Sequence, residues 1–344
     1  MAKEMEASVS RLRRFSFSLL LSPVPRIFPP MLSLTFLGTG AACPTIERNV
    51  ASLAVQREGE TMLFDCGEGT QRQMMRYGVS FAFRDIFFTH WHSDHLLGVI
   101  GLLRTMGLLN IFGGQERRDP LVLYGPKGAE RILRHALEVG IERIKFPVEI
   151  RELKVGDVIK RDQYDIVTFA TDHRADTVGY ALVEHQRLGR FHPERARELG
   201  VPEGPLWGRL HKGETVTTPE GKTVSPSDLV GPPRPGRTVV ISGDTRPTDG
   251  LRRAAKDADL LVHEATFSQE DLERAKETGH STAEEAAVIA REAGVRRLVL
   301  THISPRYSRE APELLAEARM IFEETVVARD GMVVEVPFAD GEES

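Results

Sequence analysis

Short apolar segments alternate with helical ones from Leu32 onward. Runs rich in Leu, Val, Ile and Phe predict nine strands, at residues 32–37, 51–55, 62–64, 86–88, 121–123, 166–169, 238–241, 260–262 and 298–300. Helices are predicted at residues 96–109, 281–293 and 313–324. The first is apolar on nearly every face, which is typical of a buried helix, and the second follows a serine cap and ends before Gly294. The alternation indicates an α/β fold.

Two segments depart from this pattern. Residues 186–235 hold many Gly, Pro and charged residues with little periodicity, which indicates an insertion rather than core. Residues 1–30 place three arginines before a short apolar patch that four prolines close off. The patch is at the short end for a secretory signal and no small-residue cleavage site follows it. We therefore expect a disordered extension, or an upstream start codon with Met31 as the natural beginning.

Composition and charge narrow the class of protein. Of the 344 residues, 41% are hydrophobic, which is enough for a sizeable core and excludes a disordered or fibrous chain. The net charge of −5 argues against an indiscriminately basic nucleic-acid coat but leaves room for a local basic patch. Cys43 and Cys66 cannot make a disulfide framework, and no apolar run approaches the ~18 residues of a membrane helix. These features predict a soluble, cytoplasmic protein with no membrane partner.

A His or Asp residue, in one case followed by a Glu, comes after each of six predicted strands. They are Asp65, His90, His173, Asp244, the pair His263 and Glu264, and His302. Open α/β sheets place ligand groups beyond the carboxyl ends of their strands. A sheet edge that meets solvent also needs polar residues, but that explains Ser and Lys better than a recurring choice of His and Asp. We therefore expect one site assembled from distant parts of the chain.

The densest chemical signal is residues 89–95, which read Thr-His-Trp-His-Ser-Asp-His. Neutral imidazoles and carboxylates are natural ligands of Zn²⁺ and similar divalent metals. With the later strand-end residues, seven candidate ligands are present: His90, His92, Asp94, His95, His173, Asp244 and His302. One ion takes only about four ligands. Seven, with one shared, suit two ions about 3.5–4 Å apart.

This arrangement resembles the metallo-β-lactamase superfamily, whose H-x-H-x-D-H loop matches residues 90–95. The resemblance implies a four-layer αββα sandwich with a dinuclear site at one edge and two Zn²⁺ per chain, which other divalent metals could replace. It also implies the division of the ligands: His90, His92 and His173 on the first ion, Asp94, His95 and His302 on the second, and Asp244 bridging. The superfamily hosts many reactions, so the loop alone names no substrate.

Further motifs resemble one branch, ribonuclease Z, the tRNA 3′-processing endoribonuclease. They are a glycine loop at residues 36–49 that ends in a P-x-x-x-R-N element, His-Glu-Ala-Thr at 263–266, His-Ser-Thr at 280–282 and the last ligand segment at 301–307. The resemblance runs from about Met31 to Val336, with the motifs in the family's order. Trp91, Ser93 and Pro305 depart from the usual pattern, and the Ser93 form also occurs in sulfatase-like relatives.

The insertion agrees with this branch. Residues 179–184 and 200–210 resemble the flexible arm that grips tRNA, and residues 186–212 hold six Arg and Lys against three Glu. Basic residues on such an arm can contact RNA phosphates without reading sequence, although a solvated loop would carry the same charges. The length implies the short form of the enzyme, a homodimer in which one subunit's arm serves the other's site. We expect a catalytic domain at 31–338 with the arm at 186–235 inserted.

The family pattern also assigns roles around the metals. Asp94 is the expected general base, and His280, oriented by Glu264, the donor of the leaving-group proton. Expected substrate-binding residues are Arg306, whose guanidinium can hold two phosphate oxygens, with Arg48 and Asn49.

The sequence therefore predicts a zinc-dependent endoribonuclease that removes the 3′ trailer of precursor tRNA and leaves a 3′-hydroxyl. One alternative is a relative that hydrolyses small phosphodiesters or sulfate esters, which the arm disfavours. Another is a non-catalytic RNA-binding protein, which would be expected to lack at least one ligand; none is missing from the pattern.

Overall fold

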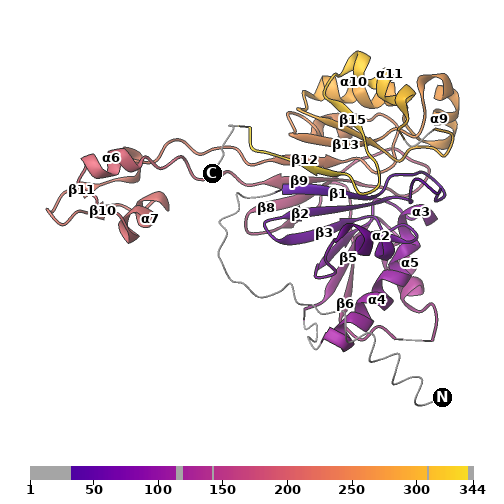
Figure 1. The fold of residues 1–344 in the computed structure, drawn as a ribbon, viewed down its shortest axis with the longest axis horizontal. Coiled ribbons are helices and arrows are strands. Elements are labelled where there is room, and N and C mark those ends of the chain that lie inside the picture. The colour runs from indigo at the N-terminus through magenta and orange to yellow at the C-terminus, as the bar shows by residue number, and fades with distance from the viewer. Residues whose placement is uncertain (1–31, 114–118, 142, 308–309, 340–344) are drawn as a thin grey trace. The chain divides into compact units, whose positions relative to one another are not determined.

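The computed structural model describes residues 32–339 apart from 114–118, 142 and 308–309, so the expectations for residues 1–30 lie outside the described residues. Two seven-stranded sheets form the core (Figure 1). The first has the order β16-β1-β2-β3-β4-β5-β6, with β1 Leu32–Gly38, β2 Ser52–Arg57, β3 Glu60–Phe64, β4 Asp85–Phe87, β5 Leu121–Gly125, β6 Val148–Glu152 and β16 Val333–Glu335. The second has the order β15-β14-β13-β12-β9-β8-β7, with β7 Val158–Lys160, β8 Tyr164–Phe169, β9 Gly179–Glu184, β12 Thr238–Ile241, β13 Leu260–Glu264, β14 Leu298–Thr301 and β15 Thr325–Val327.

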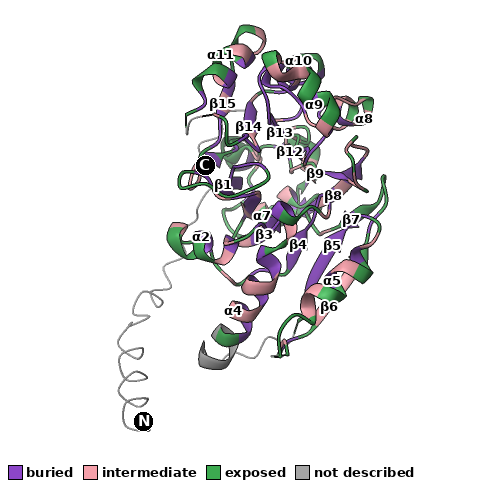
Figure 2. Ribbon diagram, turned by 90° about the vertical axis from the view of Figure 1, so that its right-hand side faces the viewer, coloured by how far each residue is buried: buried purple, intermediate pink, exposed green. Residues whose placement is uncertain are grey.

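Helices cover the outer faces of both sheets. The helices on the first sheet are α2 Thr70–Tyr77, α4 Gly98–Gly113 and α5 Ala129–Leu137, and those on the second are α8 Asp249–Ala254, α10 Ala283–Ala293 and α11 Pro312–Ile321. The inner faces share one core, in which Leu34 and Phe64 of the first sheet pack with Ile166 and Val239 of the second. Figure 2 shows buried strands between helices that expose their outer sides. The predicted αββα sandwich is confirmed.

The strands could be predicted from apolar runs in the sequence because both sheets are covered on both faces. Strands β3 to β6 and β12 to β15 pair in parallel, and buried parallel strands form continuous apolar runs. All nine predicted strands are present, with ends shifted by at most two residues. No helix in the described part of the chain is long and apolar enough to span a membrane.

The predicted helices need two corrections. The cap of α10 is Thr282, not the serine before it: its hydroxyl accepts from the Glu285 amide at 3.2 Å, and the Glu285 carboxylate accepts from the Thr282 amide. The expectation that residues 96–109 form a buried helix holds for one side of α4 only. Val99 and Leu102 are buried, whereas the side chain of Leu108 is 56% exposed, so α4 buries one side only.

The insertion also differs from its prediction. Residues 179–184 are not arm but β9, a central strand of the second sheet between β8 and β12, because this run is apolar enough to be buried. Beyond it, residues 186–235 contain α6 Pro193–Glu198, α7 Pro205–His211, β10 Val216–Thr217 and β11 Thr223–Val224 (Figure 1). They enclose a small apolar core of their own, which includes Ala196, Leu210 and Val224.

Candidate metal centre

Strand ends from both sheets deliver the predicted ligands. His90 follows β4 of the first sheet, whereas Asp244 follows β12 and His302 follows β14 of the second. His302 takes a left-handed backbone with φ 56°, as does Asp65 at the end of β3. Such a conformation is uncommon for residues other than glycine, although Asp and His tolerate it better than most, and it is often found at functional sites.

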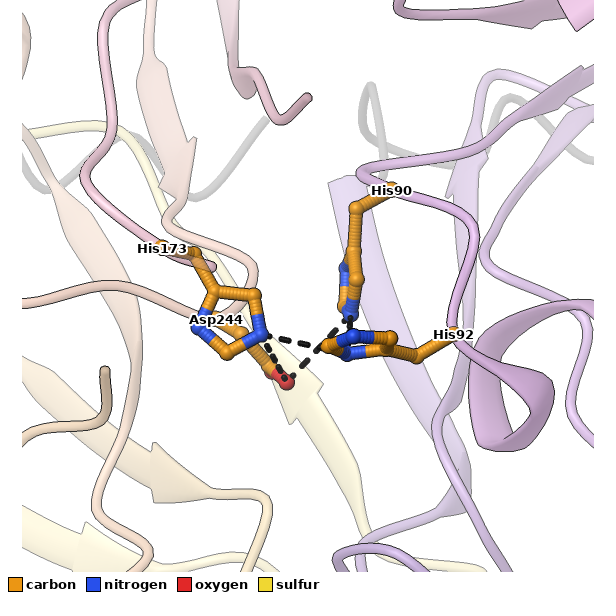
Figure 3. Close-up of side chains that lie close together, drawn as sticks. All are labelled: His90, His92, His173 and Asp244. Carbon is orange, nitrogen blue, oxygen red and sulfur yellow. Dashed lines mark hydrogen bonds and ion pairs between the residues drawn. The ribbon is translucent and has the colours of Figure 1, made fainter. Parts of the chain in front are cut away.

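A first group of four ligand atoms comes together (Figure 3). Nδ1 of His92 lies 3.0 Å from Nε2 of His90 and 3.1 Å from Nε2 of His173. Oδ2 of Asp244 lies 3.5 Å from the His90 nitrogen and 3.9 Å from that of His173. A tetrahedral zinc ion with bonds of about 2.0–2.1 Å would separate its ligand atoms by about 3.3 Å. The four atoms fit such an ion.

A second group of three ligand atoms lies beside the first. Nε2 of His95 lies 3.2 Å from Nε2 of His302, and Oδ2 of Asp94 lies 3.7 and 3.3 Å from these two nitrogens. Oδ2 of Asp244 lies 3.4 Å from both nitrogens. The Asp244 oxygen of the first group therefore also lies beside two ligand nitrogens of the second group, which is the position expected of a bridging carboxylate.

The chemistry of Asp244 itself fits a pair of cations. Its Oδ1 is buried and has no hydrogen-bond partner among the described residues. Burial raises the pKa of Asp244, but the charges of His302, His95 and His90 outweigh burial and hold that pKa well below its usual range. An ionised, buried and only partly bonded carboxylate needs positive charge beside it.

The second nitrogen of each ligand ring, except that of His92, is held by the protein. The Nδ1–H of His95 donates to Asp65 at 2.8 Å, and that of His173 to the carbonyl of Gly279 at 2.8 Å. The hydroxyls of Thr89 and Thr266 accept from His90 at 3.0 Å and from His302 at 2.9 Å. These bonds fix each ring with Nε2 toward the centre.

No role was predicted from the sequence for these supporting residues. Asp65 stood out only as a strand-end aspartate, and Thr266 only as part of a motif. Thr89 gave no signal at all, because a threonine at a strand end is common.

His280 and Glu264 form a pair beside the ligand groups. Nδ1 of His280 lies 2.9 Å from Oε1 of Glu264. Burial lowers the pKa of His280, but the charges of Glu264 and Asp244 outweigh it and raise that pKa to about 9. His280 also lies close enough to Asp244 and His302 to form a third group of potential ligands with them.

The remaining predicted residues divide in two. Asp94 and Arg306 line a cavity of about 560 Å³ over the ligand groups, and Asp94 accepts the Ala42 amide at 2.8 Å. Arg48 and Asn49 do not line it. The Arg48 guanidinium is buried and donates to Thr39 and to the Ala328 carbonyl, both at 2.7 Å, which corrects its prediction as a substrate contact. The Asn49 amide donates to the Glu68 carbonyl at 2.9 Å, which also supports the loop.

The chain is similar to known proteins over most of its length. Family models described as "Anti-Pycsar protein Apyc1" and "Beta-lactamase superfamily domain" match residues 32–189 and 217–303. Ribonuclease Z of Gemmatimonas aurantiaca is 58% identical over 311 residues, covering 90% of this chain and 97% of that protein. Ribonuclease Z of Myxococcus xanthus is 55% identical, with coverage of 90% and 99%.

A solved structure agrees with these relatives. The short form of human tRNase Z is 28% identical, with a TM-score of 0.62 and coverage of 89% of this chain and 100% of that one. The fold and its clusters of His and Asp support a divalent-metal hydrolase. The chain therefore belongs to the ribonuclease Z family, the tRNA 3′-processing endoribonucleases of the metallo-β-lactamase fold.

Proposed function

We propose that this endoribonuclease works with two Zn²⁺ per chain and leaves a 3′-hydroxyl on the tRNA. The observation that carries the proposal is the position of Oδ2 of Asp244, which belongs to the first group of four ligand atoms and lies 3.4 Å from both imidazole nitrogens of the second group. His90, His92 and His173 would hold the first ion, and Asp94, His95 and His302 the second. Bound there, the two cations would supply the charge that activates water and stabilises the phosphate in the transition state.

The chain's own residues move the protons. Asp94, steadied by the Ala42 amide, takes a proton from the attacking water as that water's oxygen bonds to phosphorus. The bond from phosphorus to the 3′-oxygen breaks, and the trailer keeps the phosphate. His280 gives its proton to the departing 3′-oxygen. Glu264 holds the His280 ring and keeps it protonated, since it raises the pKa of that imidazole.

We also propose residues 31–338 as the catalytic domain and residues 186–235 as an inserted tRNA-binding arm. The arm carries eight Lys and Arg and six Asp and Glu, so its excess positive charge is small. Exposed pairs such as Arg197 with Glu203 at 2.7 Å and Arg209 with Glu214 at 2.7 Å offset part of it. Exposed pairs are weak and exchange readily for phosphate. Arginine on a folded arm supports a contact with the tRNA body that does not depend on sequence.

A homodimer is part of the proposal. Apolar side chains lie exposed on neighbouring helices: Leu97 just before α4, Leu108 on α4, and Met75 on α2. A second copy would cover such a surface. A cytoplasmic location is also proposed, since both cysteines are free thiols, as a reducing compartment allows.

The proposal is tested on the protein purified without chelator and reconstituted with zinc. Elemental analysis should give two metals per chain. Precursor tRNA should lose its trailer, and a chelator should abolish the cut until zinc is restored. One metal or none would contradict the two-metal site. Cleavage of a chromogenic phosphodiester without cleavage of precursor tRNA would favour the small-substrate alternative instead.

A further inference from the structure

The cavity over the metal ligands holds side chains that the reaction above does not use. Besides the ligands, Asp94 and His280, it is lined by Phe267, Arg274 and Arg306. A cavity that joins an aromatic ring to two guanidinium groups is suited to a nucleotide, because bases stack on rings and on Arg planes while phosphates bind cations.

The two arginines differ in how their charge is used. Nη1 of Arg306 lies 3.4 Å from the carboxylate of Asp271. Arg274 is exposed on α9 (Leu272–Thr278) and has no carboxylate partner among the described residues. Its guanidinium carbon lies 5.9 Å above the centroid of the Phe267 ring. The ring is buried and gives Arg274 a fixed apolar surface on one side, which leaves the guanidinium plane available to a ligand on the other.

Arg274 and Phe267 belong to the same wall as His280. The His280 amide donates to the carbonyl of Ala275, the residue after Arg274, at 2.8 Å. The Phe267 carbonyl accepts from the Ala283 amide at 2.9 Å, and the rings of Phe267 and His280 are 6.2 Å apart. Arg274 therefore lies on the side of the cavity from which the leaving group is protonated.

The position of Arg274 on the same wall as His280 indicates which nucleotide of the substrate it contacts. This inference rests on the role proposed above for His280. His280 protonates the departing 3′-oxygen, which belongs to the last nucleotide that the tRNA retains. We propose that Arg274, backed by Phe267, stacks against the base of this nucleotide and positions its 3′-oxygen at His280. The contact uses a π-face that every base offers, so it tolerates all four bases and fails only where the base is absent.

The test measures single-turnover cleavage of precursor tRNAs that carry each of the four bases, or an abasic nucleotide, at the last retained position. Wild-type enzyme should cut the abasic substrate about 10- to 100-fold more slowly than the others, the range expected for one stacked base. Arg274→Ala should slow the four base-bearing substrates to the abasic rate and leave the abasic rate unchanged. Arg274→Lys, which keeps the charge without the plane, should resemble Arg274→Ala.

Lys276→Ala is the matched control, because Lys276 is a cation on the same helix that pairs with Glu273 and does not line the cavity. It should cut every substrate at the wild-type rate. Equal slowing of abasic and base-bearing substrates by Arg274→Ala would overturn stacking, as would full rescue by Arg274→Lys, because both mark a phosphate contact. Failure of the proposed function is a separate result: wild-type enzyme would not cut precursor tRNA, or His280→Ala would cut it at full rate.

Discussion

The carboxylate of Glu184 and the guanidinium of Arg237 join the two ends of the arm, 53 residues apart in sequence, at the edge of the second sheet. Oε1 of Glu184 accepts from Nη2 of Arg237 at 2.8 Å, and Oε2 accepts from Nε at 2.8 Å and from the backbone amide at 3.0 Å. Arg57 of β2 in the other sheet adds a fourth donor at 2.8 Å. This buried network fixes the root of the arm to both sheets.

Glu184→Ala should lower the free energy of unfolding by about 3–5 kcal/mol, because it removes the buried carboxylate that the guanidinium groups of Arg57 and Arg237 share. Glu149→Gln is the control, since the pair of Glu149 with Arg151 is exposed, and its change should stay within about 1 kcal/mol. Urea unfolding followed by circular dichroism measures both. Equal losses of stability in the two variants would show that the buried network of Glu184 contributes no more to the free energy of unfolding than an exposed ion pair.

The same network predicts a pH dependence. Burial raises the pKa of Glu184, but the hydrogen bonds and charge of Arg237, with Arg57, outweigh burial and lower that pKa below 4.5 in the folded protein. A carboxylate with a lowered pKa stabilises the fold above its unfolded pKa and loses this contribution as pH falls through the folded pKa. The stability gap between wild type and Glu184→Gln should therefore be constant near neutral pH and shrink below about pH 4.5. A stability difference between the two proteins that increased as the pH fell would contradict this prediction.

His280→Ala should keep both metals and tRNA binding while slowing cleavage by roughly 10²–10⁴-fold, the usual contribution of a general acid. Loss of a metal would instead make His280 a ligand, as its distance to Asp244 and His302 allows. Asp94→Ala removes a proposed ligand and the proposed base together, so its effect could not be assigned to one role.

The pairing of His280 with Glu264 is measurable without catalysis. NMR titration of the metal-free protein should give His280 a pKa of about 9. Glu264→Gln should lower this pKa, because it removes the charge that favours the imidazolium. An unchanged pKa in this variant would leave the raised value without its proposed cause.

Asp65→Ala should weaken zinc binding by about 10- to 100-fold, because the carboxylate fixes the His95 ring through the 2.8 Å bond to Nδ1. Asp165→Asn is the matched control: Asp165 faces His185 at 3.4 Å in an Asp–His pair outside the ligand groups, and its loss should leave zinc affinity unchanged. Competition with a chromophoric chelator measures both affinities. A wild-type affinity in Asp65→Ala would reduce Asp65 to a structural role.

The arm can be removed at a position that the structure defines. A deletion of residues 186–212 would leave Val216 and Val224 without their core, whereas Arg187 and Arg234 pair through two backbone hydrogen bonds of 2.8 and 3.0 Å. Replacement of residues 188–233 by Asn-Gly should close this pair as a two-residue hairpin. The variant should retain its metals and lose salt-sensitive binding of precursor tRNA. Processing at the wild-type rate would refute the role of the arm.

A homodimer predicts a sedimentation mass of about twice 38.3 kDa. Leu108→Asp on α4 should give monomers, whereas Met320→Asp on α11, which is also exposed, should not. Mixing the arm-deleted enzyme with Asp94→Ala should restore cleavage if the arm of one subunit serves the site of the other. If each arm serves its own site, the mixture stays inactive.

Several features could be predicted from the sequence because they depend on residue type and local order. His90, His92, Asp94 and His95 lie within six consecutive positions, and the strand before His302 is a buried, mainly apolar run. Metal ligation requires these few residue types, so the pattern is visible without knowledge of the fold. The αββα architecture followed from the family resemblance and from the alternation of elements.

Only the tertiary structure decided which atoms meet. His95 and His302 are 207 residues apart, and the 3.2 Å between their nitrogens depends on how two sheets pack. The same packing buries Arg48, which the motif had marked as a substrate contact, because the guanidinium satisfies the carbonyl of Ala328 from the far end of the chain. The contact of Asp65 with His95 and the network of Glu184 likewise arise from contacts between residues that are distant in sequence. Such contacts cannot be predicted from sequence periodicity. Periodicity indicates which face of a helix or strand is buried, but not which residues pack against that face.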